Sequence, residues 1–248
     1  MVEREIQSFV NFHQMVLDFA PNTCFRWCYR GQSKFDWELV PKAGRKEYFV
    51  PNISTSLGHD LDAFMKWKER AIAFLDRPPE TDLEWLAIAQ HHGLATRLLD
   101  WTQNPLVALY FAAADDLDCD GAVFVFLAPK TVGHEVSISE INSVVTYFPR
   151  PVTRRILAQQ GVFTLHPNPE IPVDSRPLSG LSQHILKSDE NLIKIRVPSR
   201  LKRSLLKQLS DYGINNVTLF PDLDGLSGYI NWQSRGSCEV LNSIEQHE

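Results

Sequence analysis

The chain has 248 residues, of which 44% are apolar and 22% are charged, an ordinary globular composition that can bury a large core. Its formal net charge of −5 argues against a generic polyanion-binding surface, although a local basic cleft is still allowed. Apolar runs are too short for a membrane span, nothing resembling a signal peptide follows Met1, and four cysteines do not make a disulfide framework. We therefore expect a cytoplasmic protein with no membrane contact.

Hydrophobic periodicity and turn residues predict alternating helices and strands in the first part of the chain. The predicted elements are a helix over 5–19, a strand over 24–31, a loop over 32–41 anchored by Trp37 and Leu39, a helix from Leu61 to about Leu75 capped by Asp60, and a helix that opens at Thr81 or Asp82 and ends at Gly93. A short buried strand should follow Gly93. Pro105 is expected to begin a buried helix over 106–114, capped by Asn104 or Thr102.

The second part of the chain continues the mixture of helices and strands. The predicted elements are a strand over 122–127, a short helix over 152–160, a strand over 161–165, a loop over 166–177, a strand over 192–198, a helix over 200–212 capped by Ser199, a strand over 214–220, and a last short helical piece from Pro221. Strict βαβ alternation is absent, so we expect an α+β fold in which mixed, mostly antiparallel sheets form a central cleft with helices packed around it. No linker divides the chain, which predicts one domain over 1–248 with its motifs in 24–226.

Titratable residues stand at the ends of predicted elements within apolar sequence. Arg30 ends the aromatic-rich strand, while His92, Arg97 and Asp100 fall in the central stretch 90–113. A buried charge must be paired or must serve a site, so we expect these four side chains to converge on one concave surface. Adjacent His91 and His92 side chains diverge on either a helix or a strand, so no metal site is predicted.

Arg30 is the sharpest candidate for ligand recognition. Its guanidinium suits bidentate binding of a carboxylate or phosphate, and Gly31 would let a ligand approach the backbone. The alternative is structural: an ion pair between Arg30 and Asp100, or another acid, that holds a loop to the core. The residues alone leave both interpretations open.

Several common sites are excluded by their missing motifs. The chain has no G-x-x-x-x-G-K-[ST] phosphate loop and no G-x-G-x-x-G fingerprint, which disfavours the usual nucleotide-binding folds. It also lacks a G-x-S-x-G nucleophile elbow, which disfavours an α/β-hydrolase.

The motifs in this order resemble the FRG domain, a family named for its Phe/Tyr-Arg-Gly motif. They read Tyr29-Arg30-Gly31-Gln32, Leu39-Val40-Pro41, Gln90-His91-His92-Gly93-Leu94-Ala95-Thr96-Arg97-Leu98-Leu99-Asp100-Trp101-Thr102, Asn104-Pro105 with the following Ala-Leu-Tyr-Phe-Ala helix, Gln159-Gln160-Gly161 with Phe163, and Leu219-Phe220-Pro221-Asp222-Leu223-Asp224-Gly225-Leu226. The resemblance covers about 24–226. It implies a bacterial protein of the kind suspected of toxin or phage-defence roles.

A second resemblance is to the ADP-ribosyltransferase superfamily. Tyr29-Arg30-Gly31 is similar to the strand that orients NAD, and Asp100-Trp101-Thr102 with Val107-Ala108-Leu109-Tyr110-Phe111-Ala112 is similar to the next strand and helix. This resemblance implies an ADP-ribosyltransferase-like fold with NAD as substrate. The implied NAD-binding residues are Tyr29, Arg30, Gly31, Gln32, Arg97, Trp101 and Thr102; the implied catalytic residues are Arg30, His92, Asp100, Gln160 and Asp222.

The superfamily's catalytic Glu-x-Glu is missing from its expected place. Gln159 or Gln160, Asp222 and Asp224 are the substitutes, and a glutamine there implies altered or lost activity because an amide cannot act as general base. In this interpretation Arg30 holds the pyrophosphate, and Asp100 or Asp222 faces the developing positive charge.

Three functions follow as hypotheses. The first is an NAD-dependent transferase or glycohydrolase that acts on a protein or nucleic-acid acceptor, as a toxin or defence effector. The second is a catalytically silent domain for ligand sensing or protein interaction. The third, less favoured, is a nuclease that uses His91, His92 and Asp100.

Overall fold

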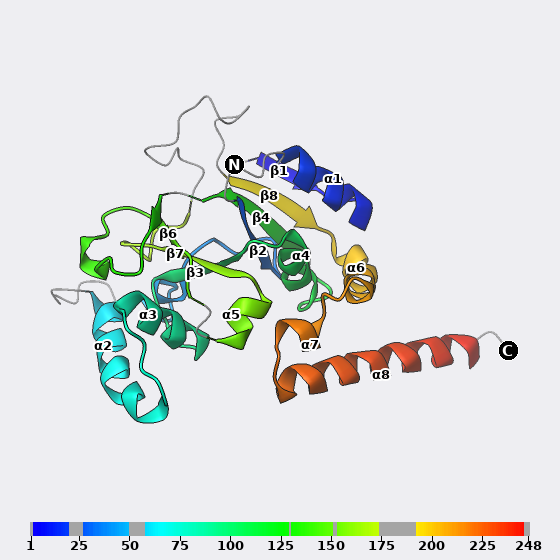
Figure 1. The fold of residues 1–248 in the computed structure, drawn as a ribbon. Helices are drawn as coiled ribbons and strands as arrows, with labels where there is room; N and C mark the ends of the chain where they lie inside the picture. Colours follow the sequence, from blue (N-terminus) through cyan, green and yellow to red (C-terminus); the bar gives the residue numbers. More distant parts are fainter. Residues whose placement is uncertain are drawn as a thin grey trace.

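A single eight-stranded sheet forms the centre of the protein in the computed structural model, which describes residues 2–19, 27–49, 58–128, 130–150, 153–173 and 192–245 (Figure 1). The strands are β1 (Val2–Glu5), β2 (Trp27–Gln32), β3 (Leu98–Thr102), β4 (Gly121–Leu127), β5 (Thr131–Val132), β6 (Val145–Tyr147), β7 (Gly161–Leu165) and β8 (Leu192–Val197). They lie in the order β1-β8-β4-β2-β3-β7-β6-β5. Only the outermost pairs, β1 with β8 and β5 with β6, are parallel, so the predicted mixed and mostly antiparallel α+β fold is confirmed, with its strands in one sheet.

Helices cover one face of this sheet in two groups. The helices are α1 (Phe9–Phe19), α2 (His59–Ala71), α3 (Asp82–His91), α4 (Pro105–Ala113), α5 (Arg154–Ala158), α6 (Ser199–Asp211), α7 (Asn216–Leu219) and α8 (Leu223–Glu245), with short 3-10 turns η1 (Lys42–Gly44), η2 (Ile72–Phe74) and η3 (Ile138–Glu140). Apolar side chains of α1, α4 and α6 share a core with β8, β4 and β2. Those of α2 and α3 share another with β3, β6 and β7. The two groups meet over the β2–β3 boundary.

The opposite face of the sheet is covered mainly by loop segments. Leu99 and Trp101 of β3 pack there against Phe126 of β4 and against Phe35 and Leu39 from the loop after β2. Leu39 is buried and anchors that loop as predicted. Trp37 is 50% exposed, so its predicted anchoring role is wrong.

The turn chemistry of the central stretch is as predicted. Thr81 and Glu84 form a capping box at the start of α3, and Gly93 follows that helix with a φ of +89°. Pro105 occupies the first turn of α4, whose Leu106 N–H is accepted by the side chain of Asn104 at 2.9 Å. These two helix ends fix where the intervening strand β3 begins and ends.

Three helix boundaries differ from prediction at their N-terminal ends. Residues 2–5 form an edge strand beside β8, and α1 begins only at Phe9 because the Ser8 hydroxyl accepts the N–H of Asn11. Asp60 lies inside α2 instead of capping it, and Gly58 precedes that helix. Pro198 is the cap position of α6, so Ser199 is its first residue.

The C-terminal part contains the largest differences. The predicted strand over 214–220 is wrong: a capping box between Asn215 and Thr218 starts the short helix α7 there. The predicted last short helical piece is the 23-residue α8, which extends away from the sheet in Figure 1. Across the described ranges, no helix combines the length and apolar character needed to cross a membrane.

Candidate functional site

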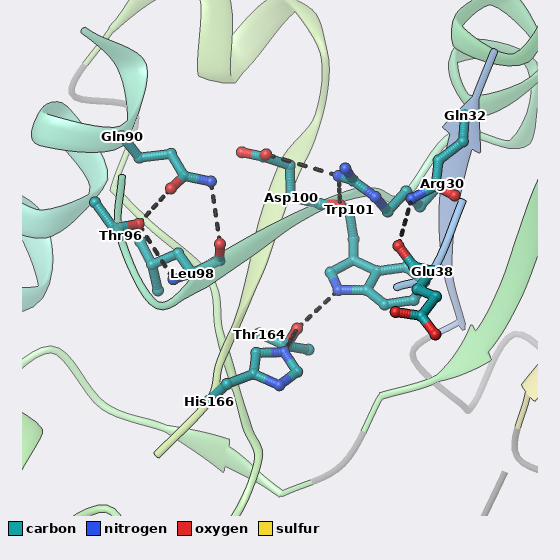
Figure 2. Close-up of polar contacts among 10 residues, drawn as sticks. All are labelled: Arg30, Gln32, Glu38, Gln90, Thr96, Leu98, Asp100, Trp101, Thr164 and His166. Carbon is teal, nitrogen blue, oxygen red and sulfur yellow. Dashed lines mark hydrogen bonds and ion pairs between the residues drawn. The ribbon is translucent and has the colours of Figure 1, made fainter. Parts of the chain in front are cut away.

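The sheet splits between β2 and β3. These two strands share one pair, Tyr29 with Thr102, whereas β2 pairs with β4 through six residues and β3 with β7 through five. Past that single pair the strands diverge, and a side chain replaces the missing ladder: Arg30 Nη1 donates to the Asp100 carbonyl oxygen at 2.7 Å (Figure 2). The gap between the two strands therefore lies at the Tyr29-Arg30-Gly31 motif of β2 and the Asp100-Trp101-Thr102 motif of β3.

A cleft of about 340 Å³ lies over this split. Residues of β2, β3, α3, α4 and α5 line it, together with the turn at η1. The polar and aromatic lining residues are Tyr29, Arg30, Lys42, Arg45, Gln90, His91, Asp100, Trp101, Thr102, Phe111, Arg155, Gln159 and Phe163. The predicted central cleft is thus present where the two helix groups meet.

The charge of the cleft is strongly positive. Its lining includes the cations Arg30, Lys42, Arg45 and Arg155, against one carboxylate, Asp100. A concave surface lined by one sign of charge concentrates its field and attracts ligands of opposite charge. The lining of this cleft is therefore suited to an anion, in a chain whose net charge is −5.

Arg30 and Asp100 form an open ion pair. The distance between Arg30 Nη1 and Asp100 Oδ2 is 3.6 Å, and the Asp100 side chain is 57% exposed while that of Arg30 is 15% exposed. Arg30 Nε is buried and has no hydrogen-bond partner among the residues that the structure describes. Burial lowers the pKa of Arg30, opposed by the Asp100 charge, but a guanidinium stays protonated in proteins. Arg30 therefore keeps donor capacity that Asp100 does not use.

Arg97 lies outside the cleft, in a closed ion pair. Its Nε and Nη2 donate to the two carboxylate oxygens of Asp60, each at 2.7 Å, and both side chains are nearly buried. Arg97, which was predicted to bind NAD, is therefore paired in the core. This pair fastens the start of β3 to α2.

The two neighbouring histidines face different cavities. His91 lines the cleft, whereas His92 lines a separate groove beside α2 with Trp67 and Phe74. Burial, with the neighbouring His92 and Arg155, lowers the pKa of His91. The expected convergence of Arg30, His92, Arg97 and Asp100 is therefore met by Arg30 and Asp100 only. Among the described residues no three histidine, cysteine or acidic side chains gather as metal ligands.

Gly31 and Trp101 line the cleft but have clear packing roles. A Cβ on Gly31 would lie 1.9 Å from the Ala108 carbonyl oxygen, so glycine is needed there for the close approach of α4. The Trp101 indole is 3% exposed and stacks on Phe126 with ring centroids 4.8 Å apart. Gln32 lies outside the cleft and donates to the Glu38 carbonyl at 3.5 Å.

A buried chain of hydrogen bonds holds the back of β3. Trp101 Nε1 donates to Thr164 Oγ1 at 2.8 Å, and that hydroxyl lies 2.8 Å from His166 Nε2 (Figure 2). A hydroxyl oxygen can accept and donate at once, so Thr164 can accept from the indole and bond His166 Nε2 in either direction, as the tautomer of the ring decides. Burial lowers the pKa of His166 to about 4, so the ring is neutral at pH 7.

The remaining predicted residues lie around the far end of the cleft. Thr102 Oγ1 donates to the Gln159 carbonyl at 2.7 Å, and Gln159 lines the cleft. Gln160 does not line it; with a φ of +47° it forms the turn between α5 and β7. The charge of Asp222 opposes the lowering of the His91 pKa. Asp222 is not a lining residue of the cleft, and its Oδ1 accepts the Gly225 N–H at 2.8 Å.

Three basic lining residues were not predicted from the sequence: Lys42, Arg45 and Arg155. Gln159 was predicted only as an alternative to Gln160. Lys42 follows the Leu39-Val40-Pro41 motif, and its Nζ donates to the Gly93 carbonyl at 2.8 Å. Arg155 lies over the Phe220 ring at 4.5 Å. Basic residues are common on surfaces, so only the fold distinguishes those that border the cleft.

Residues 25–121 match the family model of the FRG domain. This stretch of the chain is similar to the FRG domain. No curated protein and no solved structure gives a match. The matched FRG range contributes Arg30 and Asp100 to the cleft, while Arg155 and Gln159 come from beyond it. The cleft is therefore completed by the part of the chain that follows the matched range.

Proposed function

We propose that the cleft binds NAD and that the chain is an ADP-ribosyltransferase-like enzyme or an NAD glycohydrolase. The observation that carries this proposal is the set of four basic side chains around one exposed carboxylate. A pyrophosphate is recognised by such cations, and a lone carboxylate among them can stabilise positive charge on a bound sugar.

Arg30 is assigned to the pyrophosphate. Its Nη1 is fixed by the Asp100 carbonyl, so the guanidinium is held in place before a ligand arrives. Such preorganisation lowers the entropy lost on binding. Lys42 and Arg45 border the same cleft and add charge.

Asp100 is assigned to the reacting centre. The bond between ribose C1′ and the nicotinamide nitrogen breaks, and its electron pair passes to the ring, which leaves as neutral nicotinamide. The ribosyl oxocarbenium then accepts an oxygen or nitrogen from water or from a protein or nucleic-acid acceptor, which loses a proton to solvent. A carboxylate facing this centre stabilises its charge, and Asp100 is the one acid among the described lining residues.

A binding domain without catalysis is the second candidate. Two observations favour it. The Asp100 carboxylate is already in an ion pair with Arg30 at 3.6 Å, and no second acid among the described residues lines the cleft to act as general base. Such a domain would hold the ligand and release no nicotinamide.

The test follows nicotinamide release from labelled NAD by the parent protein and by Asp100→Asn. The amide keeps the shape of the side chain but not its charge, so we expect release to fall by about 100-fold or more with binding of NAD largely retained. Asp82→Asn is the matched control, since Asp82 is 47% exposed, pairs with Lys68 at 2.5 Å and lies outside the cleft. It should leave release unchanged.

Each outcome separates the candidates. NAD binding without nicotinamide release by the parent would favour the silent binding domain. Equal release by Asp100→Asn and Asp82→Asn would remove Asp100 from the reaction. Failure of the parent to bind NAD in low-salt buffer would contradict both candidates as stated for this ligand.

A further inference from the structure

A second pocket of about 300 Å³ lies where α4, α6, α7 and α8 meet. Five aromatic side chains and one acid are its most distinctive lining residues: Tyr110, Phe111, Asp115, Phe220, Tyr229 and Trp232. The helices that form it come from the middle of the chain (α4) and from its C-terminal part (α6, α7 and α8), and α8 begins beside α7 in Figure 1. The proposed NAD chemistry makes no use of this pocket.

Phe111 separates the second pocket from the cleft, because it lines both. It meets Phe220 edge to face, with ring centroids 6.1 Å apart. The guanidinium of the cleft residue Arg155 lies over the ring of Phe220, 4.5 Å from the ring centroid. The wall between the two cavities is therefore aromatic and already binds one cation through its π-system.

The aromatic side chains on the other sides of the pocket are held by specific contacts. Tyr229 and Trp232, one turn apart on α8, stack with centroids 6.0 Å apart and an interplanar angle of 22°. Tyr110 lies edge to face with Phe111 at 5.7 Å. Aromatic faces carry negative charge density, so rings gathered around one cavity attract a positively charged group.

Glycines allow α8 to approach closely enough to complete the pocket. A Cβ on Gly225 would lie 1.9 Å from the Phe220 carbonyl oxygen, and one on Gly228 would lie 2.0 Å from Asn216 Nδ2. The first contact is with backbone and would require α8 to move, whereas the second is with a side-chain end and would require Asn216 to move. The Gly225-Leu226-Ser227-Gly228 segment thus sets the position of Tyr229 and Trp232.

The charge of this pocket is opposite to that of the cleft. Asp115 is the one charged residue among the described lining residues, and no lysine, arginine or histidine is among them. Burial, with the Asp115 charge, raises the pKa of Tyr110 to about 12, so its phenol stays neutral and donates to Asn216 Oδ1 at 3.4 Å. An anionic ligand would meet repulsion here, whereas a cation would meet a carboxylate and several ring faces.

We propose that this pocket binds a small organic cation of the alkylammonium class. The methyl groups of such a cation suit the apolar walls, the positive charge suits the ring faces, and Asp115 supplies the counter-charge. The site is independent of the proposed reaction at Asp100.

The test uses choline and its neutral isostere 3,3-dimethylbutan-1-ol as probes, titrated into the full chain by calorimetry or ligand-observed NMR. The two probes have the same shape and differ in charge. We expect choline to bind between about 3- and 30-fold more tightly than the alcohol, the range that cation–π interactions support. Equal binding of both probes, or no choline binding at millimolar concentration, would overturn the proposal.

Trp232→Leu and Trp37→Leu form a matched pair of variants. Trp232 is 38% exposed and lines the pocket, while Trp37 is 50% exposed and lies outside it. Choline affinity should fall severalfold in Trp232→Leu and stay unchanged in Trp37→Leu. Asp115→Asn, which alters no ring, should also weaken the binding of choline and leave the binding of the alcohol unchanged. This variant replaces Trp232→Leu in the test if Trp232→Leu does not fold. Unchanged choline affinity in both pocket variants would place the binding elsewhere.

Discussion

Two arginine–aspartate pairs border the same strand and differ in nearly every physical respect. Arg97 at the start of β3 donates twice to Asp60 at 2.7 Å, and both side chains are nearly buried. Arg30 of β2 contacts the middle of β3, where its ion pair with Asp100 is 3.6 Å long and its Nε has no partner within the described part of the chain. The first pair is complete without a ligand, and the second is not.

This difference shows how to separate structural from functional charge in a motif. A bidentate buried pair occupies one edge of the guanidinium, and its burial keeps that arginine away from a ligand in the cleft. An arginine held through a backbone carbonyl beside an exposed acid is fixed in position and still has free donors. In this chain both kinds occur within residues 25–121, the range that matches the FRG model, and sequence spacing does not tell them apart.

The largest expected effect comes from breaking the closed pair. Arg97→Met leaves the Asp60 carboxylate buried without its partner, and we expect the free energy of unfolding to fall by about 3–5 kcal/mol. Urea unfolding followed by circular dichroism measures this change.

Two further variants test the reason for that loss. Arg97→Met combined with Asp60→Leu should recover much of the stability, because no unpaired charge is then buried. Asp100→Asn should change stability by less than about 1 kcal/mol, as expected for an exposed member of an ion pair. A loss in Asp100→Asn as large as that in Arg97→Met would contradict the contrast between the two pairs.

A smaller effect is expected from His166, which supports the closed side of β3. Its backbone N–H donates to the Arg97 carbonyl at 3.1 Å, and its ring ends the chain from Trp101 through Thr164. The pKa of His166 is lowered from 6.5 to about 4 in the folded state. Below pH 6.5 the His166 side chain is therefore protonated in the unfolded chain but stays neutral in the folded chain. The free energy of unfolding falls as the pH falls, until the pH reaches about 4.

The size of this effect can be isolated with His166→Gln. Between pH 7 and pH 5 the single site should lower the free energy of unfolding by about 2 kcal/mol. Glutamine does not titrate, so the variant should lose about that much less over the same interval. The lowered pKa of His91 acts in the same direction in both proteins and cancels. Equal pH dependence of the two proteins would show that His166 titrates normally.

Local sequence rules predicted the parts of the fold that depend on local chemistry. Gly93, Pro105 and Asn104 set the ends of α3 and α4 as expected, since a left-handed φ, a missing N–H and a short acceptor each suit one position. The strand predicted over 214–220 was wrong because its apolar run also suits a helix, and the Asn215–Thr218 capping box decided between them.

Long-range packing determined the parts of the site that could not be predicted. The motifs predicted that Arg30 and Asp100 lie close together. The cleft, however, exists because β2 and β3 share only one residue pair, while β2 pairs mainly with β4 and β3 pairs mainly with β7. These pairings join segments that are far apart in the sequence. Arg155 reaches the cleft only because α5 precedes β7 in the sheet. Burial next to Asp60 assigned Arg97 to the core, and that carboxylate lies 37 residues away in the sequence.

The smallest expected effect concerns Gly93, which touches both regions. Gly93 precedes Arg97 in the chain, and its carbonyl accepts Lys42 Nζ from the cleft at 2.8 Å. No atom lies within 4 Å of a Cβ built on Gly93, so a side chain would meet no clash and only the φ of +89° would oppose it. Gly93→Val should therefore lower the free energy of unfolding by about 1–2 kcal/mol through backbone strain, measured by urea unfolding.

Gly93→Asn is the control, because asparagine adopts the left-handed region more readily, and its free energy of unfolding should fall by less. Equal losses in the two variants would mean that the position is limited by space and not by backbone conformation.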